Sequence, residues 1–352
     1  MTSSLTMVAW LLAAQAQTDA VGPLEEQALE AHDAGEYITA RRLTEALLAA
    51  DPDNLTGLYV MGRVQWLSEG DHARAMHYLS RADQRYRTEL EDQEDRPWKL
   101  HSKIIFAMQN VAEETGDYGR QLELMDYYDE NFDPPFDPAE RAWAYMREDR
   151  LPEARQAAMS GVLSDDLWQQ VIGYNALCAV EAAEGNREDA LEACRAALEH
   201  RRENGQGSLA IAAGNASGAA VTALDFAQAE AWAREGTLNS REVTAWRRLM
   251  VMLIDQGRAI EAVEALRELR RSQAQLKPSM RALKRADIDA AFSRLLLVAG
   301  ETDRGMEVIT RALEYPDRRG LISTDEEQAR GGHSVLRVAM RRVHREREAE
   351  RD

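Results

Sequence analysis

The chain has 352 residues, with 61 acidic side chains against 43 lysines and arginines, so its formal net charge is −18. This negative charge disfavours nucleic acids and anionic membranes as partners, and it also keeps an alanine-rich surface soluble. Hydrophobic residues make up 45% of the chain but aromatic residues only 6%, and no stretch alternates as a strand does. This composition predicts an all-α protein.

Residues 1–20 are predicted to be a signal peptide or a frayed first helix. The apolar run Leu5–Ala14 is followed by Gln15 and Ala16, which completes a small-x-small cleavage pattern. The run has the length of a signal-peptide core, and it falls short of the roughly 20 residues that a membrane helix needs. We therefore expect no membrane insertion and favour an exported, periplasmic protein. Because no lysine or arginine precedes the run, a cytoplasmic protein remains the alternative.

A repeated pattern organises the chain from residue 21 to residue 316. A turn residue is followed five positions later by a residue that is small in most copies, which lets two antiparallel helices approach closely. The spacing of the copies lies on or above the roughly 34-residue period of helix-turn-helix repeats. The clear copies are Gly35 with Ala40, Gly70 with Ala75, Gly185 with Ala190 and Gly257 with Ala262; degenerate ones are Gly116 with Gln121, Asp149 with Ala154, Leu224 with Ala229 and Gly300 with Gly305.

This pattern resembles the tetratricopeptide repeat family. The best-matching copy spans Leu24–Pro52 with Gly35, Tyr37 and Ala40, and a second contains Trp246, Leu249, Gly257, Ala262 and Leu266. The resemblance covers about residues 22–316 and implies a right-handed α-solenoid of about eight antiparallel helix-turn-helix pairs. We expect the later pairs at His101–Tyr128, Pro138–Val162, Trp168–Arg202, Leu209–Thr237, Val243–Arg271 and Ile288–Tyr315.

Two parts of this array have unusual compositions. The sixth pair, Leu209–Thr237, is rich in glycine, which costs about 1 kcal/mol per residue in a helix, so it is expected to pack very closely against its neighbours or a bound partner. Residues 317–352 are expected to form a linker and a C-terminal amphipathic helix, Ser334–Glu348, whose apolar stripe and arginine-rich face suit a solenoid cap. A basic docking helix and a disordered end are the alternatives.

Cys178 and Cys194 are the only cysteines and fall at inward-facing positions on the paired helices of the fifth repeat. Free thiols are usually buried, so two small apolar core residues are the favoured interpretation. An intra-repeat disulfide is the alternative in an oxidising compartment, because sequence alone does not establish the required geometry.

Other patterns that could carry chemistry have simpler explanations. The oxygen ligands of Asp129–Glu140 have calcium-loop spacing, but Pro134 stands where the loop needs glycine, and Asp137-Pro138 reads as a helix start. Gly205–Ala210 imitates a dinucleotide fingerprint without the strand that must precede it. Pairing of a cysteine with His200 would place a nucleophile on packed helices. We therefore expect no catalytic residue, metal, cofactor or small-molecule substrate.

The resemblance implies a non-catalytic scaffold or adaptor that binds another protein or peptide in a concave groove. In this family the first helix of each pair lines the groove, and asparagine suits the task because it donates to and accepts from an extended backbone at once. Ordinary exposed polar residues are the alternative for the asparagines, and a self-assembling homo-oligomer or a metal-dependent regulator is the alternative for the function. The expected groove residues are Lys103, Phe106, Asn110, Trp143, Asn175, Arg247 and Arg294.

Overall fold

The computed structural model describes residues 22–94, 96–136, 138–204, 208–238, 242–276 and 278–319, and within these ranges the regular structure is helical throughout. The chain divides into two compact units. Unit 1 consists of Met1–Ala112, Asp126–Phe132 and Lys277–Ser279, and unit 2 consists of Glu113–Met125, Asp133–Leu276 and Met280–Asp352. The division passes through α5 (Trp98–Thr115) and α6 (Tyr118–Asn131).

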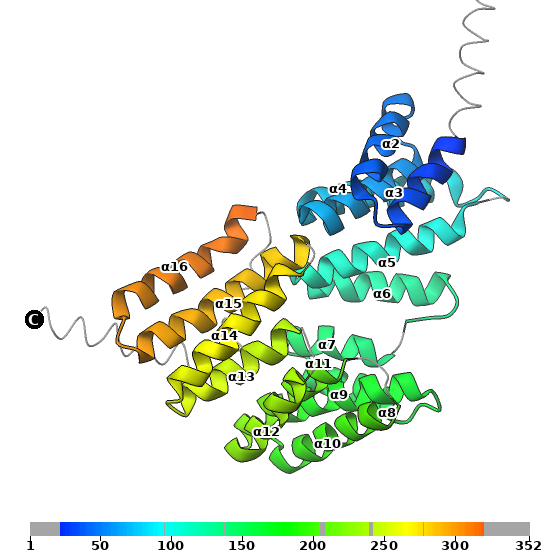
Figure 1. The fold of residues 1–352 in the computed structure, drawn as a ribbon. Helices are drawn as coiled ribbons and strands as arrows, with labels where there is room; N and C mark the ends of the chain where they lie inside the picture. Colours follow the sequence, from blue (N-terminus) through cyan, green and yellow to red (C-terminus); the bar gives the residue numbers. More distant parts are fainter. Residues whose placement is uncertain are drawn as a thin grey trace, which may run out of the picture. The chain divides into compact units, whose positions relative to one another are not determined.

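Unit 1 begins with a helix over residues 22–33, followed by α2 (Tyr37–Ala50), and Figure 1 shows these in the blue part of the ribbon. The next pair is α3 (Leu55–Val64) and α4 (His72–Arg85). Each of these two helices is continued by a π-helical turn, η1 (Gln65–Glu69) and η2 (Tyr86–Leu90) respectively. α2 packs against α3, and α3 against α4. Fully buried side chains include Leu47, Leu58, Leu79, Ile104, Ile105 and Met108.

Unit 2 continues with helices whose bounds follow the predicted pairs: α7 (Pro138–Arg147), α8 (Leu151–Val162), α9 (Leu167–Glu184), α10 (Arg187–Asn204), α11 (Leu209–Thr222), α12 (Phe226–Thr237), α13 (Val243–Asp255), α14 (Ala259–Ala274), α15 (Pro278–Val298) and α16 (Thr302–Arg319). The expected bounds of the last pair, Ile288–Tyr315, are wrong, because α15 begins at Pro278 and α16 continues past Pro316 to Arg319. The added turns at the start of α15 are rich in charged residues, so the apolar spacing typical of a helix is not recognisable there. Proline is favourable at the first position of a helix, which fits a start at Pro278. The predicted signal segment 1–20 and the predicted C-terminal helix lie outside the described residues.

The turn residues of the repeat adopt the left-handed backbone conformation at every predicted position. Six are glycines with φ between 69° and 85°, while Asp149 has φ 59° and Leu224 has φ 62°. The residue five positions later is buried in every copy, from Ala40 to Gly305. The sequence pattern therefore marks a real structural repeat: a left-handed residue ends the first helix, and a buried residue then seats the second helix against it.

Leu224 is the turn residue that fits this conformation least well. A left-handed backbone costs an L-residue with a Cβ about 1–2 kcal/mol, and the Leu224 side chain is 60% exposed and so recovers little by burial. We expect Leu224→Gly to raise the free energy of unfolding of unit 2 by about 1 kcal/mol, measured by urea denaturation. The matched reverse change is Gly185→Ala at φ 85°, which should lower it by a similar amount. A loss of stability in the Leu224 variant would contradict the assignment of strain to this turn.

The helices of unit 2 pack in an order that builds a continuous stack. The second helices α8, α10 and α12 each contact the first helix of their own pair and that of the next: α8 lies against α7 and α9, α10 against α9 and α11, and α12 against α11 and α13. The first helices also contact one another in sequence, α7 with α9, α9 with α11, and α11 with α13. These helices of unit 2 are thus a stack of helical hairpins, and α7, α9, α11 and α13 form a row of first helices.

Candidate partner-binding surface

The row of first helices carries a strip of accessible residues along one face of α11. Ile211, Asn215, Gly218 and Thr222 follow one another at spacings of three or four, so they lie on the same side of the helix. Ile211 is 40% exposed, Thr222 is exposed, and Asn215 and Gly218 are half-buried. We call these four residues the α11 strip. The rest of α11 is nearly all buried, including Ala213 and Ala216 at 0%, so the strip is the accessible side of this helix.

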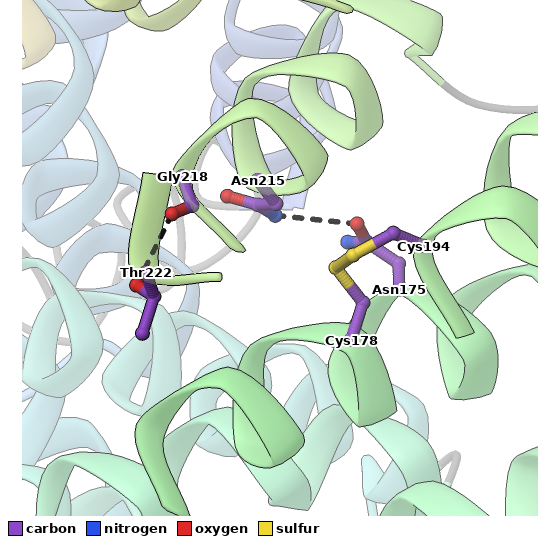
Figure 2. The surroundings of a disulfide bond; sticks show 6 residues. All are labelled: Asn175, Cys178, Cys194, Asn215, Gly218 and Thr222. Carbon is purple, nitrogen blue, oxygen red and sulfur yellow. Dashed lines mark hydrogen bonds between the residues drawn. A yellow bond between two sulfur atoms is a disulfide. The ribbon is translucent and has the colours of Figure 1, made fainter. Parts of the chain in front are cut away.

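Asn215 lies in the middle of the strip and contacts the neighbouring first helix. Its Nδ2 donates to Oδ1 of Asn175 on α9 across 3.2 Å, and Figure 2 shows the two amides facing each other. Asn175 is only 5% exposed, whereas Asn215 is half-buried. An asparagine side chain has two N–H donors and an oxygen with two lone pairs. The bond between the two amides uses one of these donors and therefore orients both side chains while leaving hydrogen-bonding capacity.

On its other side the strip meets Arg248 of α13. A Cβ placed on Gly218 would lie 3.0 Å from Nη2 and 3.2 Å from Cζ of Arg248, so the guanidinium lies against the glycine. Nearby, a Cβ on Gly214 would be 3.5 Å from the methyl group of Thr244. The prediction that the glycine-rich sixth pair packs closely is confirmed at Gly218 and at Gly236, where a Cβ would be 3.1 Å from that of Ala213 on α11 and 3.4 Å from that of Ala245 on α13. Because Gly218 has no side chain, the guanidinium of Arg248 can lie against its backbone, next to the strip.

A disulfide holds the helix that carries Asn175. Cys178 of α9 and Cys194 of α10 are bonded, which decides between the alternatives left open by the sequence. Both are in the core, at 1% and 0% exposure. Cys178 lies three residues after Asn175, one turn along the same helix, and Figure 2 shows the bond beside the Asn175–Asn215 contact. The disulfide therefore fixes α9 against α10 one helical turn away from the Asn175–Asn215 contact.

Solved structures with a similar arrangement of helices include a tetratricopeptide repeat protein from Parabacteroides merdae ATCC 43184, at TM-score 0.56 and 14% identity over 72% of this chain and 93% of that chain. Another is a Rap protein complexed with Competence and Sporulation Factor, at TM-score 0.52 and 15% identity over 86% of this chain and 88% of that chain. The fold is that of tetratricopeptide repeat proteins. No protein-family model and no curated protein sequence matches the chain.

In this tetratricopeptide repeat fold, the predicted groove residues of unit 2 all lie on first helices, but they differ in surroundings. Asn175 contacts the α11 strip. Trp143 on α7 is half-buried and packs on the small cluster that contains Ala142 and Ala176. Arg247 on α13 is half-buried, and Arg294 on α15 forms an ion pair with Asp255.

The predicted groove residues of unit 1 lie together on α5. Lys103 is exposed, Phe106 is 46% exposed, and Asn110 donates from its amide to the carbonyl oxygen of Phe106 on its own helix. The hydrogen bond within the helix engages one of the two donors of Asn110. These three residues therefore form a group within unit 1, and the α11 strip belongs to unit 2.

Sequence reasoning missed Asn215, Gly218 and Arg248, although one signal pointed to them. The glycines of α11 indicated close packing or a bound partner, but they did not identify which side of the helix is accessible. The sequence predicts Arg247 and not its neighbour Arg248, and a shift of one position rotates a helical side chain by about 100°. The two residues therefore have different surroundings, and it is the guanidinium of Arg248 that lies against the strip.

The structure also bears on the calcium loop, the dinucleotide fingerprint and the membrane helix considered from the sequence. Asp129 and Asn131 belong to α6, and the Asn131 amide donates to the carbonyl of Tyr127, so this part of the proposed calcium loop is helical. Among the described residues, which exclude Asp137, no group of three or more His, Cys, Asp or Glu side chains could hold a metal ion. The segment before Gly205 is α10 and not the strand that a dinucleotide fingerprint needs. None of the helices in the described ranges is both long and apolar enough to cross a membrane.

Proposed function

We propose that this protein is a non-catalytic interaction scaffold, and that the α11 strip with Asn175 and Arg248 binds an extended segment of a partner protein. The observation that carries the proposal is the hydrogen-bonded pair Asn175–Asn215, held on adjacent first helices beside an arginine. Extended peptides present alternating carbonyl and N–H groups, which asparagine can meet with both of its functions. The Rap protein of similar fold is complexed with Competence and Sporulation Factor, which supports partner binding as a use of this fold.

The chemistry of the strip indicates what kind of segment it takes. Ile211 offers an apolar contact at one end and Asn215 a backbone-directed amide in the middle, while Gly218 leaves room for the guanidinium of Arg248. Arg248 adds one positive charge beside Gly218, in a chain of net charge −18. The partner segment therefore has an apolar side chain followed by backbone groups and an acidic or carbonyl-bearing group near Arg248.

The disulfide supports a location for this binding. Disulfides persist in oxidising compartments and are rare in the cytosol, so the bond between Cys178 and Cys194 supports the exported, periplasmic protein favoured from the sequence.

The test is site-specific photo-cross-linking in the native cell, with benzoylphenylalanine at Ile211 and, as a matched control, at Ile260. Ile260 lies on α14 and is 81% exposed, and Ile211 is 40% exposed, so both positions tolerate a larger side chain. We expect one recurrent partner polypeptide to be captured from position 211 and not from position 260. Asn215→Ala in the same background should weaken that partner's binding about tenfold, which corresponds to about 1.4 kcal/mol.

Two outcomes would overturn the proposal. Equal capture of the same proteins from both positions would show that the strip has no selectivity. Cross-links from position 211 only to another copy of this chain would show that the face is used in self-assembly, which is the alternative that the sequence left open.

A further inference from the structure

Unit 1 contains a pocket of its own. It has a volume of about 460 Å³, and both its aromatic walls and its charged rim come from residues of unit 1. The aromatic residues that line it are Tyr86, Trp98, His101, Tyr127 and Phe132, and the polar ones are Glu91, Asp92, Arg96 and Asn131. We call it the aromatic pocket.

The rings of the aromatic pocket are packed against one another. Tyr86, the first residue of η2, stacks on His101 of α5 with ring centroids 3.7 Å apart, and the two side chains are 4% and 1% exposed. Tyr127 and Phe132 approach the same histidine edge-on, at 5.8 Å and 5.5 Å. The change from α-helix to π-helix at Tyr86 is thus found where the chain builds the pocket, as such turns often are at functional sites.

An ion-pair network behind the rings fixes them further. Nε2 of His101 donates to Oδ1 of Asp83 at 2.7 Å, and Nε of Arg87 donates to the same oxygen at 2.8 Å. Burial opposes ionisation of Asp83, but these hydrogen bonds outweigh it and hold the pKa of the carboxyl below its usual value. The Arg87 guanidinium also lies 3.7 Å from the centre of the Tyr127 ring. The aromatic walls are therefore held in place before any ligand arrives.

The rim of the pocket is predominantly acidic. Glu91 and Asp92 are exposed lining residues, and they belong to a stretch in which Glu89 and Glu94 are exposed as well. Arg96, the arginine among the described lining residues, donates from Nη1 to the carbonyl oxygen of Glu91 at 3.1 Å, which ties its guanidinium to the rim. Trp98 also lines the pocket, and 47% of its surface is exposed. Lys99 lies 5.5 Å from the Trp98 ring, and neither it nor Arg87 lines the pocket.

We propose that the aromatic pocket binds an arginine side chain from a basic segment of a partner protein. A guanidinium is planar, so it stacks on aromatic faces such as those of Trp98 and Phe132, and its N–H groups pair with carboxylates such as those of Glu91 and Asp92. An aromatic side chain could use the walls but not the acidic rim. A carboxylate or phosphate would be repelled by that rim and by the net charge of −18. The acidic rim therefore favours a cation, and the aromatic walls favour a planar one such as a guanidinium.

The test uses fluorine NMR on the full chain labelled with 5-fluorotryptophan, whose seven tryptophans give separate reporters. The Trp98 signal is assigned with Trp98→Phe. The probes are N-acetyl-arginine amide, the neutral isostere N-acetyl-citrulline amide, and N-acetyl-phenylalanine amide. We expect arginine to shift the Trp98 signal saturably, with the other two weaker by about fivefold or more. The internal control is Trp168, which is 44% exposed on α9 in unit 2 and should not respond.

The rim is tested with Glu91→Gln/Asp92→Asn, both exposed positions at which the fold should tolerate the change. This double variant should bind arginine about tenfold more weakly without a shift in the unliganded Trp98 signal. Citrulline or phenylalanine binding as well as arginine, an equal response of Trp168, or an unchanged affinity in the double variant would each overturn the proposal.

The chain's own arginine-rich C-terminal sequence is the competing occupant. Replacing Arg337, Arg341 and Arg342 with serine should leave the unliganded Trp98 signal where it is. A shift on that replacement would show that the pocket holds this segment and not a partner. These results are independent of cross-linking at the α11 strip, because the two sites are in different units.

Discussion

Gly173→Ala should lower the free energy of unfolding of unit 2 by about 3 kcal/mol or more, although it adds only one methyl group. A Cβ on Gly173 of α9 would lie 2.5 Å from the backbone nitrogen of Val162, 2.7 Å from the carbonyl carbon of Gly161 and 2.8 Å from the carbonyl oxygen of Ala158. These are main-chain atoms of α8 and its end, so no side-chain rotation relieves the contact. The two helices would have to separate and lose the packing between them.

The measurement is urea denaturation of the full chain followed by circular dichroism, because the fold is helical. The matched control is Gly119→Ala in α6, where a Cβ would meet nothing within 4 Å. Alanine is the better helix former, so that variant should be neutral or more stable by up to about 1 kcal/mol. If Gly173→Ala lowered the free energy of unfolding no more than Gly119→Ala does, the close approach of α8 and α9 at Gly173 would be contradicted.

Replacing both Cys178 and Cys194 with alanine should lower the free energy of unfolding of unit 2 by about 3 kcal/mol. The bond joins residues with a sequence separation of 16, and closing a loop of this length in the unfolded chain accounts for roughly that amount. Alanine is the suitable substitute because both positions are buried, and serine would add an unpaired hydroxyl to the core. Against a total stability of about 5–15 kcal/mol for a typical domain, this is a large share.

The control for the cysteine variant is the unchanged chain unfolded with and without a thiol reductant. The reductant should lower its stability to that of the Cys178→Ala/Cys194→Ala variant and should not affect the variant itself. Intact-mass analysis after alkylation without reduction, on protein taken from its native cell, should find no free thiol. A stability that does not depend on reductant, or two alkylated cysteines in the native protein, would contradict the bond.

The same variant also connects stability to the proposed function. Asn175 is one turn from Cys178, so loosening α9 against α10 should let the Asn175 amide turn away from Asn215. Partner capture at Ile211 should then fall even under conditions in which the variant is fully folded. This would separate a role of the disulfide in orienting the site from its role in stabilising the chain.

The sequence by itself determined the elements and their repetition, because these depend on short-range effects. A left-handed turn residue followed by a buried small residue is encoded within a few positions, and helical periodicity shows the rest of each pair. For this reason the amino-acid pattern alone predicts the turns of Gly185 with Ala190 and even of the degenerate Leu224 with Ala229. Where charged residues masked the apolar period, as at the start of α15, the prediction was wrong.

The tertiary structure alone decided which faces meet. Asn175 and Asn215 are 40 positions apart, and their hydrogen bond depends on the register at which α9 packs on α11. The choice of Arg248 over Arg247 depends on the rotation of α13, and the aromatic pocket depends on a π-helical turn that brings Tyr86 onto His101. Helix formation follows from local backbone preference and apolar spacing, whereas register and rotation follow from the fit of whole surfaces, to which residues far apart in the chain contribute together.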